Sequence, residues 1–169
     1  QAFRITSLPG SIVCFTRWDV EQVWRDAIGL AGFECKRQLV WAKNAHTMGD
    51  CKRQFGASHE PAIFAIKEKR RGKGSASFAF PGGRPTTMLK HAKPPPSIRT
   101  HPTEKPVSLL EELIESLTRP GDLVVDPFAG SGSTGEAALR TGRRFFGCEM
   151  DAEHFERARS RLKGVASRS

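Results

Sequence analysis

Several features are missing from this 169-residue sequence, and each absence excludes a class of protein. No apolar run is long enough to span a membrane, and no segment has the apolar core of a signal peptide. The four cysteines form no C-x-x-C pair, which argues against a zinc site or a disulfide framework and favours a reducing compartment. Two of them, Cys14 and Cys148, lie in apolar strand-like runs and are expected in the core.

Acidic residues are scarce in one part of the chain. The formal net charge is +9, and residues 66–100 hold nine Lys or Arg residues against one acid, Glu68. Five prolines and four glycines in that segment favour a long loop over a packed element. Such a loop indicates a polyanionic partner, although it can also be a solvated surface. Phe78 and Phe80 inside it either stack on bases or anchor the loop to the core.

The most informative stretch is a glycine-rich turn at residues 126–134, D-P-F-A-G-S-G-S-T. It follows an apolar strand at 123–125 and precedes a helical stretch at 135–140. A strand, a turn and a helix start in this order hold a small ligand against backbone N–H groups. A second strand ends in Glu149 about twenty residues later, where an acid accepts ribose hydroxyls of nucleotide-like ligands.

Two cofactors fit this pattern, and the position of Asp126 distinguishes them. Residues 130–135 also read G-x-G-x-x-G, the dinucleotide fingerprint, but three residues separate Asp126 from Gly130. A carboxylate at the strand end would repel a pyrophosphate and would suit the ammonium group of S-adenosylmethionine. The pattern therefore favours the methyl donor over NAD. A glycine-rich turn without any ligand is the remaining alternative.

Three blocks carry a resemblance to a known family. They are H-P-T-E-K-P at 101–106, the turn at 126–134, and R-R-F-F-G-C-E-M-D at 143–151. Together they resemble the amino-methylating DNA methyltransferases, which modify adenine N6 or cytosine N4, in the permuted class whose catalytic motif precedes the cofactor motif. Residues 38–44 and 59–61 resemble the family more weakly. The resemblance implies an α/β, doubly wound Rossmann-like S-adenosylmethionine-dependent methyltransferase fold.

The resemblance also implies a set of cofactor-binding residues. Asp126 should face the ammonium group or organise the turn, Glu149 should accept the ribose hydroxyls, and Met150 should lie against the adenine. Thr103 and Lys105 should approach the methionine carboxylate, with a surface charge at a helix end as the alternative for Lys105. The full expected set is Thr103, Lys105, Asp126, Pro127, Phe128, Gly130, Ser131, Gly132, Thr134, Glu149 and Met150.

The expected partner is double-stranded DNA, and the basic loop is the expected contact. Its cations should contact phosphates with little base discrimination and should be mobile without DNA. The candidate DNA-binding residues are Lys67, Lys69, Arg70, Arg71, Lys73 and Arg84. The family resemblance further implies a cytoplasmic DNA-modification enzyme, encoded by a bacterium or phage, within a restriction–modification system.

The family's catalytic motif, [D/N/S]-P-P-[Y/F/W], is missing. The only adjacent prolines are at 94–96, no tyrosine occurs, and the D-P-F at 126–128 belongs to the cofactor turn. No catalytic residue is therefore assigned, and the chain alone is expected to be inactive. Residues 1–8 look like the tail of a helix and lack an initiator methionine. We expect a fold incomplete at the N-terminus, with the motif in a missing segment or in a second chain.

Hydrophobic periodicity predicts the remaining elements. Strands are expected at 11–15, 38–42, 62–66 and 144–148, with a hairpin formed by the second and third. Asp19 should cap a helix with a buried apolar stripe at Val20, Val23, Trp24, Ala27, Ile28 and Ala31. Helices at 107–117 and 152–162 should bury Val107, Leu110, Leu113, Ile114 and Leu117 in the first, and Phe155, Ala158 and Leu162 in the second.

The sequence thus divides into a catalytic-side part at 1–66, the basic loop at 67–100 and the cofactor-binding half at 101–169. A site-specific DNA amino-methyltransferase, or a fragment of one, is the favoured interpretation. A non-catalytic or split nucleic-acid-binding module and an NAD-dependent oxidoreductase are the alternatives. A cytosine-C5 enzyme fits less well, because none of the cysteines follows a proline.

Overall fold

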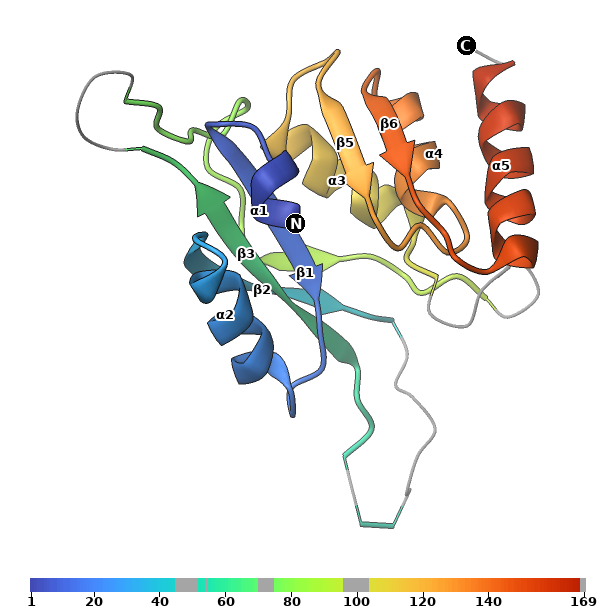
Figure 1. Ribbon diagram of the computed structural model, residues 1–169. Helices are drawn as coiled ribbons and strands as arrows, with labels where there is room; N and C mark the ends of the chain where they lie inside the picture. The colour runs from blue at the N-terminus through green and yellow to red at the C-terminus, as the bar shows by residue number, and fades with distance from the viewer. Residues whose placement is uncertain (45–51, 54, 70–74, 96–103, 168–169) are drawn as a thin grey trace. The chain divides into compact units, whose positions relative to one another are not determined.

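The computed structural model describes residues 1–44, 52–53, 55–69, 75–95 and 104–167. These residues form two compact units (Figure 1). The first unit comprises Gln1–Ala79 and Pro85–Lys90, and the second comprises Phe80–Arg84 and His91–Ser169. The α/β class expected from the sequence is confirmed, because both units combine strands with helices.

The first unit is built on a four-stranded sheet with the order β1-β3-β2-β4. Strand β3 lies antiparallel between β1 and β2, and β4 runs parallel to β2. The predicted hairpin of β2 and β3 is confirmed. The strands are β1 (Gly10–Phe15), β2 (Glu34–Ala42), β3 (His59–Lys67) and β4 (Met88–Lys90).

Strand β3 is paired on both edges and contributes a continuous run of buried apolar side chains to the core of this unit. Ile63 and Ala65 pack with Ile28 and Phe33. Helix α1 (Ala2–Ile5) contributes Phe3, whose ring meets the edge of the Phe33 ring at a centroid distance of 5.0 Å. The amino group of Lys67 donates to the carbonyls of Phe3 and Thr6 at 2.7 Å each and so holds the end of α1.

Helix α2 (Glu21–Leu30) corrects two predictions. Asp19 does not cap the helix, since its carboxylate accepts from the Arg17 guanidinium and Val20 takes the N-cap position. The predicted stripe is buried only at Ile28, while Val23 and Trp24 are exposed. Periodicity identifies an apolar face, but it does not tell whether another element covers all of it.

The basic segment also contains more packed structure than expected. Strand β4 lies within it, and Leu89 is fully buried there. Phe78 packs edge-on against Phe64 at 5.8 Å between ring centroids, and its backbone N–H donates to Glu68. Of the two roles left open for Phe78, the structure supports the anchor to the core.

The second unit contains a parallel pair, β5 (Leu123–Asp126) and β6 (Arg144–Gly147), linked by helix α4 (Ser133–Arg140). Helix α4 contacts both strands and lies between α3 (Val107–Leu117) and α5 (Ala152–Ala166) (Figure 1). The buried stripe of α3 is confirmed at Leu110, Leu113 and Ile114, and it also includes Leu109. The hydrogen-bonded strands of the described chain fall into two sheets, the four-stranded sheet of the first unit and the β5–β6 pair of the second.

Two polar residues of the 143–151 block shape this unit. Buried Arg143 donates to the carbonyl and hydroxyl oxygens of Thr118 at 2.8 and 3.0 Å, and to the carbonyl of Thr141. Thr118 and Thr141 end α3 and α4, so Arg143 places its charge at two helix C-termini, where the partial charge is negative. Asp151 caps α5 by accepting from the His154 N–H at 2.9 Å.

Side chains alternate across β5 and β6. Val124 and Phe145 point toward one face and are partly buried, whereas Leu123, Val125 and Phe146 on the other face are exposed. Two core predictions are wrong here: Cys148 is exposed, and Phe155 of α5 is 45% exposed. Ala158 of α5 is buried as expected.

Candidate functional site

The turn after β5 is organised by the carboxylate at the end of that strand. One oxygen of Asp126 accepts from the Phe128 N–H at 3.0 Å, and the other accepts from the Thr134 hydroxyl at 2.7 Å. Thr134 lies in the first turn of α4, so Asp126 links the start of the turn to the helix that follows it. Of its two predicted roles, the structure shows the organising one.

Two glycines of the turn adopt backbone angles that other residues rarely take. Gly130 has a φ of 52° and Gly132 a φ of 76°. A Cβ atom at Gly132 would lie 3.0 Å from the Ala158 Cβ and 3.1 Å from its Cα. Gly132 is therefore required both by conformation and by its close approach to α5.

Glu149 ties the turn to the segment after β6. One of its oxygens accepts from the Gly130 N–H at 2.8 Å, and the other accepts from the N–H groups of Met150 and Asp151 at 2.9 and 3.0 Å. The hydrogen bonds from Asp151, Gly130 and Met150 stabilise the anion and lower the pKa of Glu149. A carboxylate has about four acceptor positions, so about one further donor, such as a ligand hydroxyl, can still be accepted.

Backbone hydrogen bonds reinforce the same junction. The Ala129 N–H donates to the Cys148 carbonyl at 2.8 Å, and the Cys148 N–H donates to the Asp126 carbonyl at 3.0 Å. The two loops at the carboxyl ends of the parallel strands are therefore joined along their length. Ligands of open α/β sheets bind at such strand ends.

Two large apolar side chains flank this junction and remain in solvent. Phe128 is 85% exposed and Met150 is 100% exposed. Together with the Glu149 carboxylate and the backbone of Gly130, they form a surface that suits a ligand with an aromatic ring and vicinal hydroxyls. The arrangement contains hydrogen-bond acceptors and apolar area.

The structure brings most of the predicted cofactor residues together at the end of β5, on the two loops and at the start of α4. This group comprises Asp126, Pro127, Phe128, Gly130, Ser131, Gly132, Thr134, Glu149 and Met150. Lys105 is half-buried just before α3, and Thr103 lies outside the described residues.

Sequence reasoning did not identify the residues behind the turn. Glu104 and Glu136 are buried, and both are paired with Arg161 of α5. A charge at position 161, beside the apolar inner-face positions Ala158 and Leu162, is the sequence signal that could have indicated a buried pair.

The predicted DNA-binding residues are described only in part. Lys67 is engaged with α1 carbonyls and with the Phe3 ring, as described above. Lys69 and Arg84 are exposed, while Arg70, Arg71 and Lys73 lie outside the described residues.

Membrane-spanning helices and metal clusters are both absent from the described part of the chain. No helix there is long and apolar enough to cross a membrane. No group of three or more His, Cys, Asp or Glu side chains within it could hold a metal ion.

Comparison with known proteins places these features in context. A family model described as a DNA methylase, for the N6/N4 group, matches residues 1–160. The chain is 51% identical over 154 residues to the type II methyltransferase M2.DpnII of Streptococcus pneumoniae. This alignment covers 81% of this chain and 56% of that protein. It is 30% identical over 162 residues to the DNA adenine methyltransferase YhdJ of Escherichia coli (strain K12). That alignment covers 77% of this chain and 53% of the relative.

The fold of this chain is also similar to that of a solved structure. The crystal structure of the M1.HpyAVI–SAM complex matches with a TM-score of 0.81 at 29% identity, covering 94% of this chain and 77% of that chain. The chain spans between 53% and 67% of the length of three curated relatives that it matches.

The lowered pKa of Glu149 predicts a specific pH dependence of stability. A depressed carboxyl pKa contributes stability that is present above the unfolded value of about 4.3 and is lost as the pH falls through the folded value. The advantage of the wild type over Glu149→Gln in urea midpoint should therefore be constant near neutral pH and shrink in acid. Glu153→Gln, on an exposed side chain of α5, is the control and should show little difference at any pH. Parallel curves for the wild type and Glu149→Gln would contradict the assigned hydrogen bonds.

Proposed function

Because the chain belongs to the N6/N4 DNA methylase family, we propose that it is the cofactor-binding part of a site-specific DNA methyltransferase. The proposed reaction transfers a methyl group from S-adenosylmethionine to the exocyclic amino group of adenine (N6) or cytosine (N4). The observation that carries the proposal is the junction of Gly130 and Glu149, where an ionised acid and a glycine turn meet at the carboxyl ends of two parallel strands.

The residues present fit this cofactor. The Glu149 carboxylate already accepts three N–H groups and retains capacity for about one further donor, such as a ribose hydroxyl. Met150 offers an exposed apolar side chain for the adenine. Backbone groups of Phe128, Gly130 and Gly132 line the same surface. Thr103 and Lys105 are proposed to approach the methionine carboxylate. When bound, S-adenosylmethionine supplies an electrophilic methyl group on a positively charged sulfur.

The rival cofactor, NAD, fits the same residues less well. The Asp126 carboxylate lies at the end of β5 and is held there by the Phe128 N–H and the Thr134 hydroxyl. A pyrophosphate at the N-terminus of α4 would approach this negative charge closely. The distance along the chain from Asp126 to Gly130 also departs from the dinucleotide pattern.

The 169 residues contain no recognisable clamp for a flipped base. Direct methyl transfer to an amino group needs no covalent intermediate, so catalysis depends on extruding the base and aligning its nitrogen with the methyl group. We propose that a segment carrying the [D/N/S]-P-P-[Y/F/W] motif, in the same polypeptide or in a second chain, supplies this clamp. The exposed apolar side chains Leu123, Val125 and Phe146 support this, because parallel strands are ordinarily covered on both faces.

A non-catalytic nucleic-acid-binding module is the second candidate function. The basic segment at 67–100 favours it, since charge alone can hold DNA without any methyl transfer. In both proposals the exposed Lys69 and Arg84, together with Arg70, Arg71 and Lys73, contact phosphates.

Cofactor binding tests the main proposal. The chain should bind S-adenosylmethionine or its demethylated product in calorimetric titration, and Glu149→Ala should weaken binding by about 10- to 100-fold, as expected when hydrogen bonds to a charged group are removed. Glu153→Ala is the matched control, since its side chain is 73% exposed on α5, and it should leave the affinity unchanged. Equal affinities of the wild type and Glu149→Ala would remove the ribose assignment, and tight NADH binding would favour the dinucleotide alternative.

Salt dependence tests the DNA contact. Replacing Lys69, Arg70 and Arg71 by glutamine should weaken duplex binding at low salt and make the salt dependence shallower, by about 0.9 in log–log slope for each phosphate that is no longer neutralised. The control replaces three exposed cations of α5, Arg157, Arg159 and Lys163, by glutamine. An unchanged slope in the first variant would show that the basic segment does not contact phosphates.

An assay of methyl transfer tests whether the 169 residues need a further segment for catalysis. The 169-residue chain, incubated with tritiated S-adenosylmethionine and mixed-sequence duplex DNA, should incorporate no label. Orientation of reactants contributes roughly 7–11 kcal/mol in well-aligned systems, so its loss takes turnover below detection. A segment with the motif, added in cis or in trans, should restore incorporation. Robust incorporation by the 169 residues alone would overturn the proposed need for a further segment.

A further inference from the structure

A cluster of buried charges lies behind the glycine turn. Glu104 and Glu136 are each only 7% exposed, and the side chain of Arg161 is 24% exposed. One terminal nitrogen of Arg161 donates to Glu104 at 2.7 Å and to the Ser131 carbonyl at 3.2 Å, while its Nε donates to Glu136. Burial by itself would lower the pKa of Arg161, but its hydrogen bonds to Glu136 and Glu104 raise it above the ordinary value. The guanidinium is therefore permanently charged.

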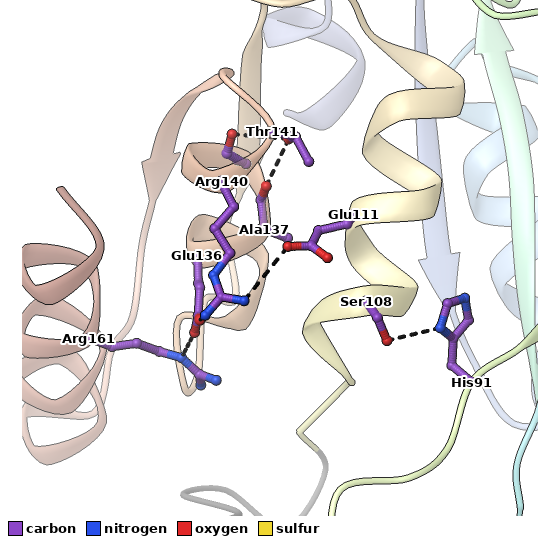
Figure 2. A network of polar contacts seen from close by, with 9 residues as sticks. His91, Ser108, Glu111, Glu136, Ala137, Arg140, Thr141 and Arg161 are labelled. Atoms are coloured by element: carbon purple, nitrogen blue, oxygen red, sulfur yellow. Dashed lines mark hydrogen bonds and ion pairs between the residues drawn. The ribbon is translucent and has the colours of Figure 1, made fainter. Parts of the chain in front are cut away.

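The cluster joins segments that are far apart in the sequence. Ser131 belongs to the turn, Glu136 to the first half of α4, and Glu104 to the segment that precedes α3. Figure 2 shows that ion pairs extend this cluster, from Glu136 to Arg140 and from Arg140 to Glu111 of α3. A guanidinium nitrogen of Arg140 lies 3.9 Å from a carboxylate oxygen of Glu111. Arg161 is the member that contacts both the turn and the segment before α3.

Stability alone does not explain such a cluster. Removing charges from water costs several kcal/mol per ion, and buried ion pairs are often no more stabilising than apolar residues of the same shape. A planar guanidinium does, however, fix the relative positions of several acceptors, because its donors have a rigid geometry. The arrangement is therefore suited to fixing the position of the glycine turn relative to the segment before α3.

We propose that Arg161 is a positioning residue for the cofactor: by holding Glu104 and the Ser131 carbonyl together, it sets the segment at Lys105 against the glycine turn and so determines affinity for the methionine end of the ligand. The inference rests on the proposed function, since it concerns the same site. Arg161 itself need not touch the ligand. The nucleoside end is held by Glu149 and Met150, which are not members of the cluster.

Two ligands distinguish binding at the nucleoside end of the proposed site from binding at its amino-acid end. S-adenosylhomocysteine carries the nucleoside and the amino acid, whereas 5′-methylthioadenosine carries the nucleoside alone. Arg161→Lys retains the charge but cannot hold three acceptors in one plane. It should weaken S-adenosylhomocysteine binding by about tenfold or more in calorimetry and leave methylthioadenosine binding within about twofold. Arg159→Lys, an exposed neighbour on α5, should change neither affinity.

A second variant keeps the test informative if the first folds poorly. Glu104→Gln preserves shape and removes one charged partner, so it should show the same selective loss. The double variant should lose no more than the greater of the two single losses, because both changes break the same ion pair. Equal weakening of both ligands, or no weakening of either, would overturn the positioning role. Failure of the wild type to bind either ligand would instead overturn the proposed function, and the inference with it.

Discussion

The hydrogen bond from the Gly130 N–H to Glu149 is the contact on which the candidate site depends. It joins the loop after β5 to the loop after β6, and the same carboxylate also accepts two N–H groups of its own loop. Three such donors hold the group in its ionised form, so an anion is present at the strand ends before any ligand arrives. Preorganised acceptors of this kind need little rearrangement on binding, which favours affinity.

Three residues besides Glu149 hold the turn, and each uses a different interaction. Asp126 connects its start to Thr134 through hydrogen bonds, Gly132 allows α5 to approach to van der Waals contact, and Arg161 reaches the Ser131 carbonyl from α5. A carboxylate hydrogen bond, close glycine packing and a hydrogen bond from a guanidinium to a carbonyl thus converge on one short turn. A substitution at any of them would change the geometry of the turn.

Local pattern predicted the elements well where a strand or helix is defined by its own residues. The strands at 123–126 and 144–147 and the buried stripe of α3 were expected within a residue or two, because alternation and 3.6-residue periodicity follow directly from side-chain direction. The errors have another origin. Val23 and Trp24 lie on an apolar face that is left exposed, Cys148 follows the end of its strand, and Leu89 is buried by pairing with a strand nearly fifty residues away. None of these outcomes depends on the neighbouring residues alone.

The family and the position of the glycine turn could be predicted from the sequence. The three blocks at 101–106, 126–134 and 143–151 carry that information because a strand, a glycine turn, a helix and an acid must follow at set spacings to form such a site. Other contacts could be found from the three-dimensional structure alone: Lys67 holds helix α1, and Asp126 organises the turn. Arg161 likewise meets Glu104, Ser131 and Glu136. These contacts join residues from separate elements, and hydrogen-bond partners across such distances are set by packing, which sequence periodicity does not specify.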